Sequence, residues 1–261
     1  MLTPFAFRSY HLCDELAGAQ MQRPASGGFR SNKQKDERRP VTEIPNLDLL
    51  PMTAGTNDAG HLTIGDCDVV SLAEMYGTPL YVYDEHTIRS MCRQFVDGFE
   101  SEYADSHISY SSKAFTNPVL AQILEEEHVG IDVVTGGELA IVRAVNFPAR
   151  DLNFHGNNKD RVELGEALDY GIGRIMGANL PGLDLLNKLA SERGVVQAIL
   201  LRVTPGIDPH THAKTTTGLV DSKFGLNISN GQAAEAVRRA LECMSLELKG
   251  LHFHLGSPIF E

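Results

Sequence analysis

The chain has 261 residues, of which 42% are hydrophobic and 22% charged, a composition typical of a globular protein with one large domain or two small ones. Its formal net charge of -11 argues against a nucleic-acid partner, because nothing in the sequence offsets repulsion from phosphate. No apolar run approaches the roughly 20 residues that span a bilayer, so no membrane partner is expected. The four widely spaced cysteines form no CxxC pair, which favours neither a metal site nor a disulfide framework and fits the cytoplasm.

The first part of the chain differs from the rest. Residues 1–45 are polar, mixed in charge and without periodicity, and we predict that they form a disordered leader. Residues 46–84 are more regular and predict a strand at 61–64, a helix at 69–76 and a second strand at 79–83. We treat residues 46–84 as a segment distinct from the remainder of the chain.

Residues 85–261 alternate steadily between strand and helix patterns. An amphipathic helix at 87–99 comes first. Strands are predicted at 108–110, 130–134, 152–154, 174–176, 198–203 and 248–253. Helices are predicted between them at 118–128, 137–146, 159–170, 183–193 and 231–244. Such short connections imply an α/β fold with parallel strands covered by helices.

The choice between an open sheet and a barrel depends on where polar residues occur. No GxGxxG run follows any predicted strand, which argues against a dinucleotide-binding sheet. Polar side chains recur instead at several strand ends, as they do at the mouth of a (β/α)8 barrel. Six strands are too few to close such a barrel, so we interpret 85–261 as a partial (β/α)8 TIM-type barrel of about six βα units, and the chain as a fragment.

Lys113 stands at the carboxyl end of the first barrel strand, within the run from Ser109 to Phe115. Functional groups gather at this end of parallel strands, and a lysine kept from water loses its proton more readily. Such an amine forms Schiff bases with aldehydes. The alternative is an ordinary solvated lysine that happens to follow a strand.

Three further charged residues lie at strand ends. Asp132 stands inside an apolar strand and needs a partner or a solvated mouth. Glu138 comes next, in the first helical turn, where the helix dipole alone explains an acid. Arg202 ends another apolar strand, a position from which arginine typically binds a carboxylate or phosphate. The loop at 208–225 after it has the composition of an anion-binding lid.

Two histidine-containing stretches complete the pattern. The segment at 155–159 is a polar loop, and a turn with a helix cap suffices to explain Asn157 and Asn158. His252 and His254 lie on one face of the last strand, and Ser257 comes after them with a hydroxyl suited to phosphate. Together with a strand-end lysine, an imidazole wall and a phosphate cradle describe a pyridoxal phosphate pocket.

The run from Ser109 to Ala114 resembles the Tyr-x-x-Lys-Ala segment of the fold-type III, alanine-racemase-like pyridoxal phosphate enzymes, and 132–138 resembles their second-strand motif. Within this family, the stretches at 211–225 and 252–261 are similar to diaminopimelate decarboxylases rather than to ornithine or arginine decarboxylases. The resemblance extends from about residue 47 to residue 261.

This resemblance implies an enzyme that uses pyridoxal 5'-phosphate to decarboxylate a small amino acid, meso-diaminopimelate, to L-lysine. The implied site residues are Lys113, Asp132, Glu138, Arg202, His254 and Ser257. Lys113 would bind the cofactor as a Schiff base and take part in catalysis with His254, which would stack on the ring. Ser257 would contact the phosphate. No metal site is implied.

The resemblance also places the family's glycine-rich phosphate loop and its ring-nitrogen acid beyond residue 261, and joins the strands of 46–84 to a C-terminal β domain. We therefore expect the isolated chain to fold poorly and to show no activity, with a homodimer expected for the family rather than for this fragment. Alternatives are another fold-type III decarboxylase or racemase, and a non-catalytic barrel that binds the same cofactor.

Overall fold

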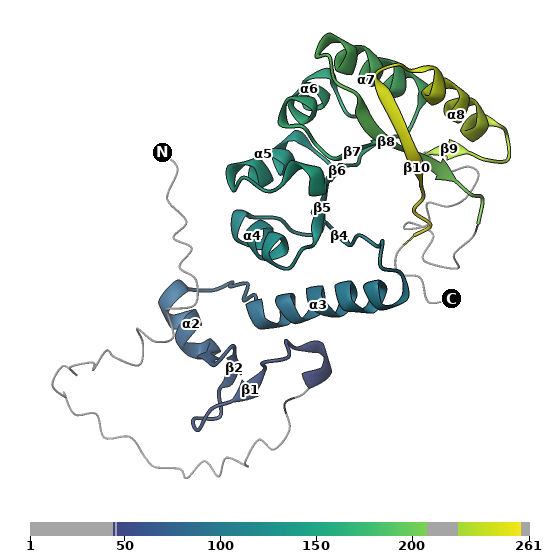
Figure 1. Ribbon diagram of the computed structural model, residues 1–261. Helices are drawn as coiled ribbons and strands as arrows, with labels where there is room; N and C mark the ends of the chain where they lie inside the picture. The colour runs from purple at the N-terminus through teal and green to yellow at the C-terminus, as the bar shows by residue number, and fades with distance from the viewer. Residues whose placement is uncertain (1–43, 45, 208–223, 257–261) are drawn as a thin grey trace, which may run out of the picture. The chain divides into compact units, whose positions relative to one another are not determined.

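The computed structural model describes residues 44, 46–207 and 224–256 (Figure 1). Except for residue 44, the predicted leader at 1–45 lies outside the described residues. Residues 208–223 of the predicted lid and Ser257 also lie outside them. The chain divides into two compact units, Met1–Gln94 and Phe95–Glu261. Helix α3 (Glu85–Glu102) runs across this division and corresponds to the helix predicted at 87–99.

The described residues of the first unit contain a small antiparallel sheet in the order β1-β2-β3 together with helical segments. Its elements are η1 (Leu47–Leu49), β1 (Gly55–Thr56), β2 (Leu62–Ile64), β3 (Cys67–Asp68) and α2 (Val69–Tyr76). Asp68 caps α2 by accepting hydrogen bonds from the backbone N–H groups of Val70 and Ser71. Its second carboxylate oxygen lies 2.8 Å from His61 Nδ1, so the helix start and the sheet are joined by one side chain.

Two predictions for this unit are wrong. Residues 79–83 form no strand, because this run of apolar and aromatic residues has no neighbouring strand to pair with among the described residues, and Tyr81 is 85% exposed. Cys67 is disulfide-bonded, whereas the wide spacing of the cysteines predicted no such bond. Pairing between remote cysteines leaves no signature in their spacing.

The second unit contains the sheet that was predicted from the alternating pattern. Its strands are all parallel and are arranged in the order β10-β8-β7-β6-β5-β4, with β9 paired to β8. They are β4 (Ser109–Ser111), β5 (Gly130–Val133), β6 (Leu152–Phe154), β7 (Arg174–Gly177), β8 (Gln197–Thr204), β9 (Leu226–Asn227) and β10 (Leu246–His252). The six predicted strands are confirmed, and β9 was not predicted.

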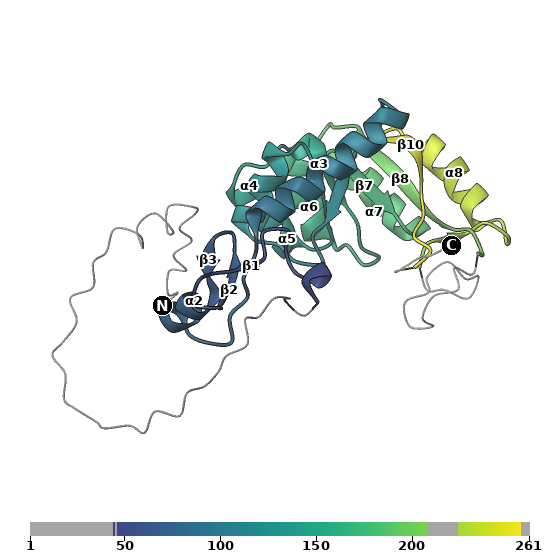
Figure 2. The ribbon, with the colours of Figure 1, turned by 90° about the horizontal axis from the view of Figure 1, so that it is seen from below.

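The helices of this unit lie outside the curved sheet, as Figure 1 shows. They are α4 (Pro118–Glu126), α5 (Gly136–Ala144), α6 (Arg161–Tyr170), α7 (Leu180–Glu192) and α8 (Gln232–Glu242), with the short η2 (Ala149–Asp151) before β6. Figure 2 shows β8 and β10 running side by side with α8 beside them. The partial barrel predicted from the sequence is confirmed, and none of the described helices is both long and apolar enough to cross a membrane.

The connections that lead into α4, α5, α6 and α7 each end in a residue whose side chain caps the helix. Side chains of Asn117, Thr135 and Asn179 accept hydrogen bonds from backbone N–H groups in the first turns of α4, α5 and α7. For α6 the cap is Asp160, which forms a capping box with Glu163. Assigning the cap of this helix to Asn157 and Asn158 was therefore wrong, since the helix begins two residues later than predicted.

The core lies between the sheet and these helices. The strand residues that face the helices are completely buried, among them Val133, Phe154 and Ile175. Leu164 and Leu183 pack against them from α6 and α7 and are 2% exposed or less. Burial of each such side chain stabilises the fold by about 1.5–3 kcal/mol. Because side chains alternate along a strand, the opposite face of the sheet is left for polar residues.

Candidate functional site

The polar residues of the parallel strands lie on the sheet face that the helices do not cover. Strand pairing sets Asp132 beside Ser111 on β4 and beside Asn153 on β6. At the far side of the sheet, His252 on β10 is paired with Arg202 on β8. The register of parallel strands thus sets side by side residues that are 21 to 50 positions apart in the sequence.

Asp132 is held by two neighbours on this face. Asn153 Nδ2 donates to one carboxylate oxygen at 3.0 Å, and His155 Nε2 lies 3.2 Å from the other. Burial raises the pKa of Asp132, but the hydrogen bond and charge of His155 and the amide of Asn153 outweigh it, so that the pKa falls below its ordinary value. The side chain is therefore a carboxylate at neutral pH.

Glu138 does more than complement the dipole of α5. Its Oε2 accepts hydrogen bonds of 2.6 Å from the backbone N–H of Val134 and from the hydroxyl of Ser112. Ser112 Oγ also lies 2.7 Å from the carbonyl oxygen of Asp132. Glu138 thus joins the end of β5 to the turn that carries Lys113.

Lys113 lies in a turn directly after β4, and its side chain is exposed. The prediction that it is kept from water is wrong for this structure, because β4 is the last strand at this edge of the sheet and nothing described covers its end. His254 comes after β10 and is partly buried. Burial, together with the positive charges of Lys113, Arg202 and His155, lowers the pKa of His254. Lys113 and His254 therefore belong to one electrostatic cluster.

Arg202 reaches into the same cluster from β8. Its guanidinium carbon lies 4.9 Å from the centre of the Phe224 ring, a cation–π distance, and its Nη1 lies 3.5 Å from Asn157 Oδ1. Burial lowers the pKa of Arg202, but arginine remains charged in proteins because its intrinsic pKa is so high.

Among the histidines that the structure describes, His252 has the pKa that lies furthest from its ordinary value. Its ring meets that of His155 edge to face, with centres 4.9 Å apart. Burial, together with the charges of His155 and Arg202, lowers the pKa of His252 to about 4. The ring is therefore neutral at pH 7.

Two buried polar atoms on this face have no hydrogen-bond partner among the described residues. They are Nδ1 of His252 and Oδ1 of Asn153. Buried polar atoms are normally satisfied by protein, water or ligand. Together with the positive charges of Lys113 and Arg202, these atoms make the face suited to a flat, anionic ligand that carries its own polar groups. The described residues thus fit pyridoxal phosphate.

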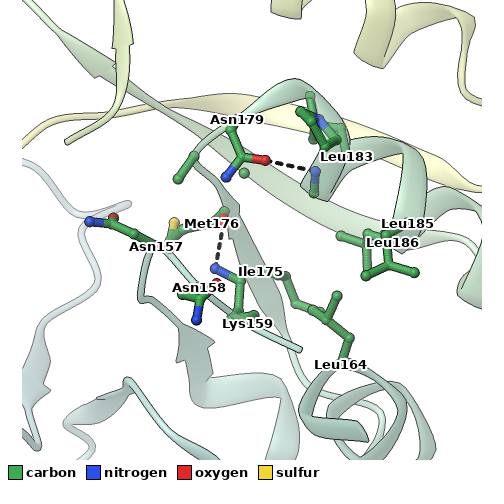
Figure 3. A pocket seen from close by; sticks show the side chains of 14 residues that line it. Asn157, Asn158, Lys159, Leu164, Ile175, Met176, Asn179, Leu183, Leu185 and Leu186 are labelled. Atoms are coloured by element: carbon green, nitrogen blue, oxygen red, sulfur yellow. Dashed lines mark hydrogen bonds between the residues drawn. The ribbon is translucent and has the colours of Figure 1, made fainter. Parts of the chain in front are cut away.

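Sequence reasoning placed His155 at a strand end but gave it no role, and it missed Asn153 and Lys159 as members of this region. Lys159 lines a cavity of about 190 Å³ between β7, α6 and α7, and Figure 3 shows its amine directed at the carbonyl oxygen of Met176. Asn153 and His155 carried one available signal, because each stands at or near the end of a predicted strand next to that of Asp132. Ser257 lies outside the described residues.

Comparison with known proteins identifies the family. Residues 86–261 match the family described as the pyridoxal-dependent decarboxylase, pyridoxal binding domain. The chain belongs to this family. Its partial barrel corresponds to the pyridoxal binding domain that this family describes.

Relatives in this family include diaminopimelate decarboxylases. That of Bacillus methanolicus is 46% identical over 209 residues, which are 80% of this chain and 48% of the relative. That of Bacillus subtilis is 46% identical over 213 residues, 82% of this chain and 48% of the relative. A crystal structure of diaminopimelate decarboxylase from M. jannaschii in co-complex with L-lysine superposes with a TM-score of 0.71 and 34% identity, covering 79% of this chain and 48% of that chain. The chain spans about half the length of these relatives.

Proposed function

We propose that this chain provides the cofactor-binding part of a diaminopimelate decarboxylase, which removes carbon dioxide from meso-diaminopimelate to give L-lysine. The observation that carries the proposal is that the cationic side chains of Lys113 and Arg202 lie close enough to His254 to lower its pKa. In a chain with a formal net charge of -11, such a local excess of cationic side chains suits an anionic ligand. The identity with diaminopimelate decarboxylases supports the choice of substrate.

The proposed cofactor-binding residues are Lys113, Asp132, Glu138, Arg202, His254 and Ser257. When bound, pyridoxal phosphate supplies an electron-withdrawing ring that stabilises the negative charge left at the substrate carbon when carbon dioxide leaves. Lys113 would hold the cofactor through Nζ and would move a proton at the same atom. His254 offers the flat face of its imidazole as a wall for the ring.

The remaining residues attract the bound molecules and hold the site in place. Arg202 attracts the anionic groups of the bound molecules and cannot lose its charge by deprotonation. Asp132 keeps its negative charge because the hydrogen bond and charge of His155 and the amide of Asn153 lower its pKa. Glu138 holds Ser112 and thereby fixes the turn that presents Lys113. A cytoplasmic location and a homodimer of the complete enzyme are parts of the same proposal.

The cofactor assignment is tested by adding pyridoxal phosphate to the purified chain and recording its visible absorbance. We expect a band that Lys113→Ala abolishes and that Lys249→Ala leaves intact, because Lys249 is an exposed residue of β10 paired with Glu247. Adding meso-diaminopimelate should then shift the band more than adding L-ornithine does, since the amine of the proposed substrate would compete with Lys113 for the cofactor. A band that persists in Lys113→Ala contradicts the cofactor assignment, and an equal response to both amino acids contradicts the substrate.

A further inference from the structure

The loop at 155–159, between β6 and α6, has a fixed conformation that no helix cap explains. The capping box of α6 is formed by Asp160 and Glu163, outside the loop. Gly156 has a φ of +93°, and a Cβ placed there would lie 3.0 Å from the carbonyl oxygen of Val134. The backbone therefore passes close to the end of β5, in a conformation that favours glycine.

Lys159 ties this loop to the neighbouring strand. Its amine donates hydrogen bonds to the carbonyl oxygens of Gly156 at 2.6 Å, Met176 at 2.9 Å and His155 at 3.3 Å. A lysine ammonium has three N–H donors, and each has an acceptor here. Because a buried charge is costly unless its hydrogen bonds are satisfied, these three acceptors determine where the side chain lies. Two of them belong to the loop and one belongs to β7.

The loop in turn reaches three other strands of the site. The ring of His155 contacts Asp132 on β5 and His252 on β10. Asn157 lies 3.5 Å from the guanidinium of Arg202 on β8. Any displacement of the loop backbone therefore moves, at the same time, the side chains that contact Asp132, His252 and Arg202.

We propose that Lys159 is a positioning residue, which fixes His155 against Asp132 by binding the 155–159 loop to the carboxyl end of β7. Its importance for catalysis rests on the proposed function, but the contacts themselves exist without the cofactor. Lys159 touches no residue of the proposed cofactor set directly and acts through the backbone of the loop.

The test monitors the carboxyl carbon of Asp132 by NMR during a pH titration of the cofactor-free chain. In Lys159→Met, which keeps the length of the side chain without its donors, we expect the acid dissociation constant of Asp132 to fall about tenfold. The reason is that Asp132 stays buried while its hydrogen bond from His155 is lost. His155→Phe reproduces the change, and Lys249→Met leaves the titration as in the unmodified chain.

A folded Lys159→Met chain with an unchanged Asp132 titration overturns the proposal, because a purely structural lysine would lower stability without moving this value. Should this variant unfold, Lys159→Gln keeps two amide donors, and we expect it to show a smaller change of the same sign. In the unmodified chain, ¹⁵N NMR is expected to show one lysine ammonium whose protons exchange slowly with water and which Lys159→Gln removes. Absence of that signal also overturns the proposal. Since no cofactor is added, these outcomes are independent of the proposed function.

Discussion

At the scale of single residues, the site depends on how each ionisable group is balanced by its neighbours. Asp132 stays charged inside a sheet because His155 and Asn153 both bind it. His252 stays neutral because burial and nearby cations oppose its protonation. The sequence indicated Asp132 as an acid in need of a partner, but it could not name the partner, since His155 comes from a loop more than twenty residues later.

His252 gives a prediction for stability at acidic pH. Its pKa in the folded chain, about 4, lies below the ordinary value of 6.5, so the unfolded chain binds more protons between these values and stability falls as the pH is lowered through this range. The groups that face it are His155, Arg202, Asp132 and His254. Allowing for partial solvent exposure, we expect the unmodified chain to lose about 1 kcal/mol more than His252→Phe between pH 6.5 and pH 5.

Urea unfolding of both chains at each pH measures this difference, and the comparison cancels the carboxylates that both chains share. Above about pH 8 the two curves should run in parallel, since His252 is then neutral in both the folded and unfolded states. Equal losses in the two chains on acidification would show that His252 is protonated as easily in the folded chain as in the unfolded one.

At the scale of elements, the sequence predicted what depends on local pattern. The helices and the six predicted strands of the second unit are consistent with apolar periodicity, and helix ends shift by a few residues where caps such as Asp160 decide the start. The sequence did not predict those strands and contacts that depend on residues far away along the chain. Residues 79–83 have strand-like composition but no partner strand among the described residues, β9 is only two residues long, and Lys159 binds a carbonyl of β7 that no pattern in its own segment announces.

Close backbone approach between elements gives a second prediction. Gly173 lies just before β7, and a Cβ placed there would be 2.1 Å from the carbonyl oxygen of Arg150 in η2. We expect Gly173→Ala to lower the free energy of unfolding by about 2–4 kcal/mol, because only backbone atoms could move to relieve the clash. The matched control is Gly98→Ala in α3, where nothing lies within 4 Å and alanine favours the helix by about 1 kcal/mol.

Thermal or urea unfolding of the two variants distinguishes these effects. A Gly173→Ala chain as stable as the unmodified protein would mean that η2 and β7 are not in contact as described. A destabilised Gly98→Ala chain would mean that the added methyl group in α3 meets a neighbour.

At the scale of the whole molecule, the arrangement of charge is uneven. The chain is acidic overall, yet the carboxyl ends of its parallel strands gather Lys113 and Arg202 near His254. A single sheet with one covered face produces this result, because alternation sends apolar residues to the helices and polar residues to the other side. The barrel architecture could be predicted from the sequence, whereas the mutual placement of the site residues required the register of β4, β5, β8 and β10.

The central claim is that Lys113 is the amine that holds pyridoxal phosphate. The most direct test is to incubate the chain with the cofactor, reduce the carbon–nitrogen double bond with borohydride, and locate the modified lysine by peptide mass spectrometry. We predict the phosphopyridoxyl group on Lys113, with the other lysines modified only at the level found in a denatured control. Modification of other lysines with Lys113 left unmodified would contradict the account.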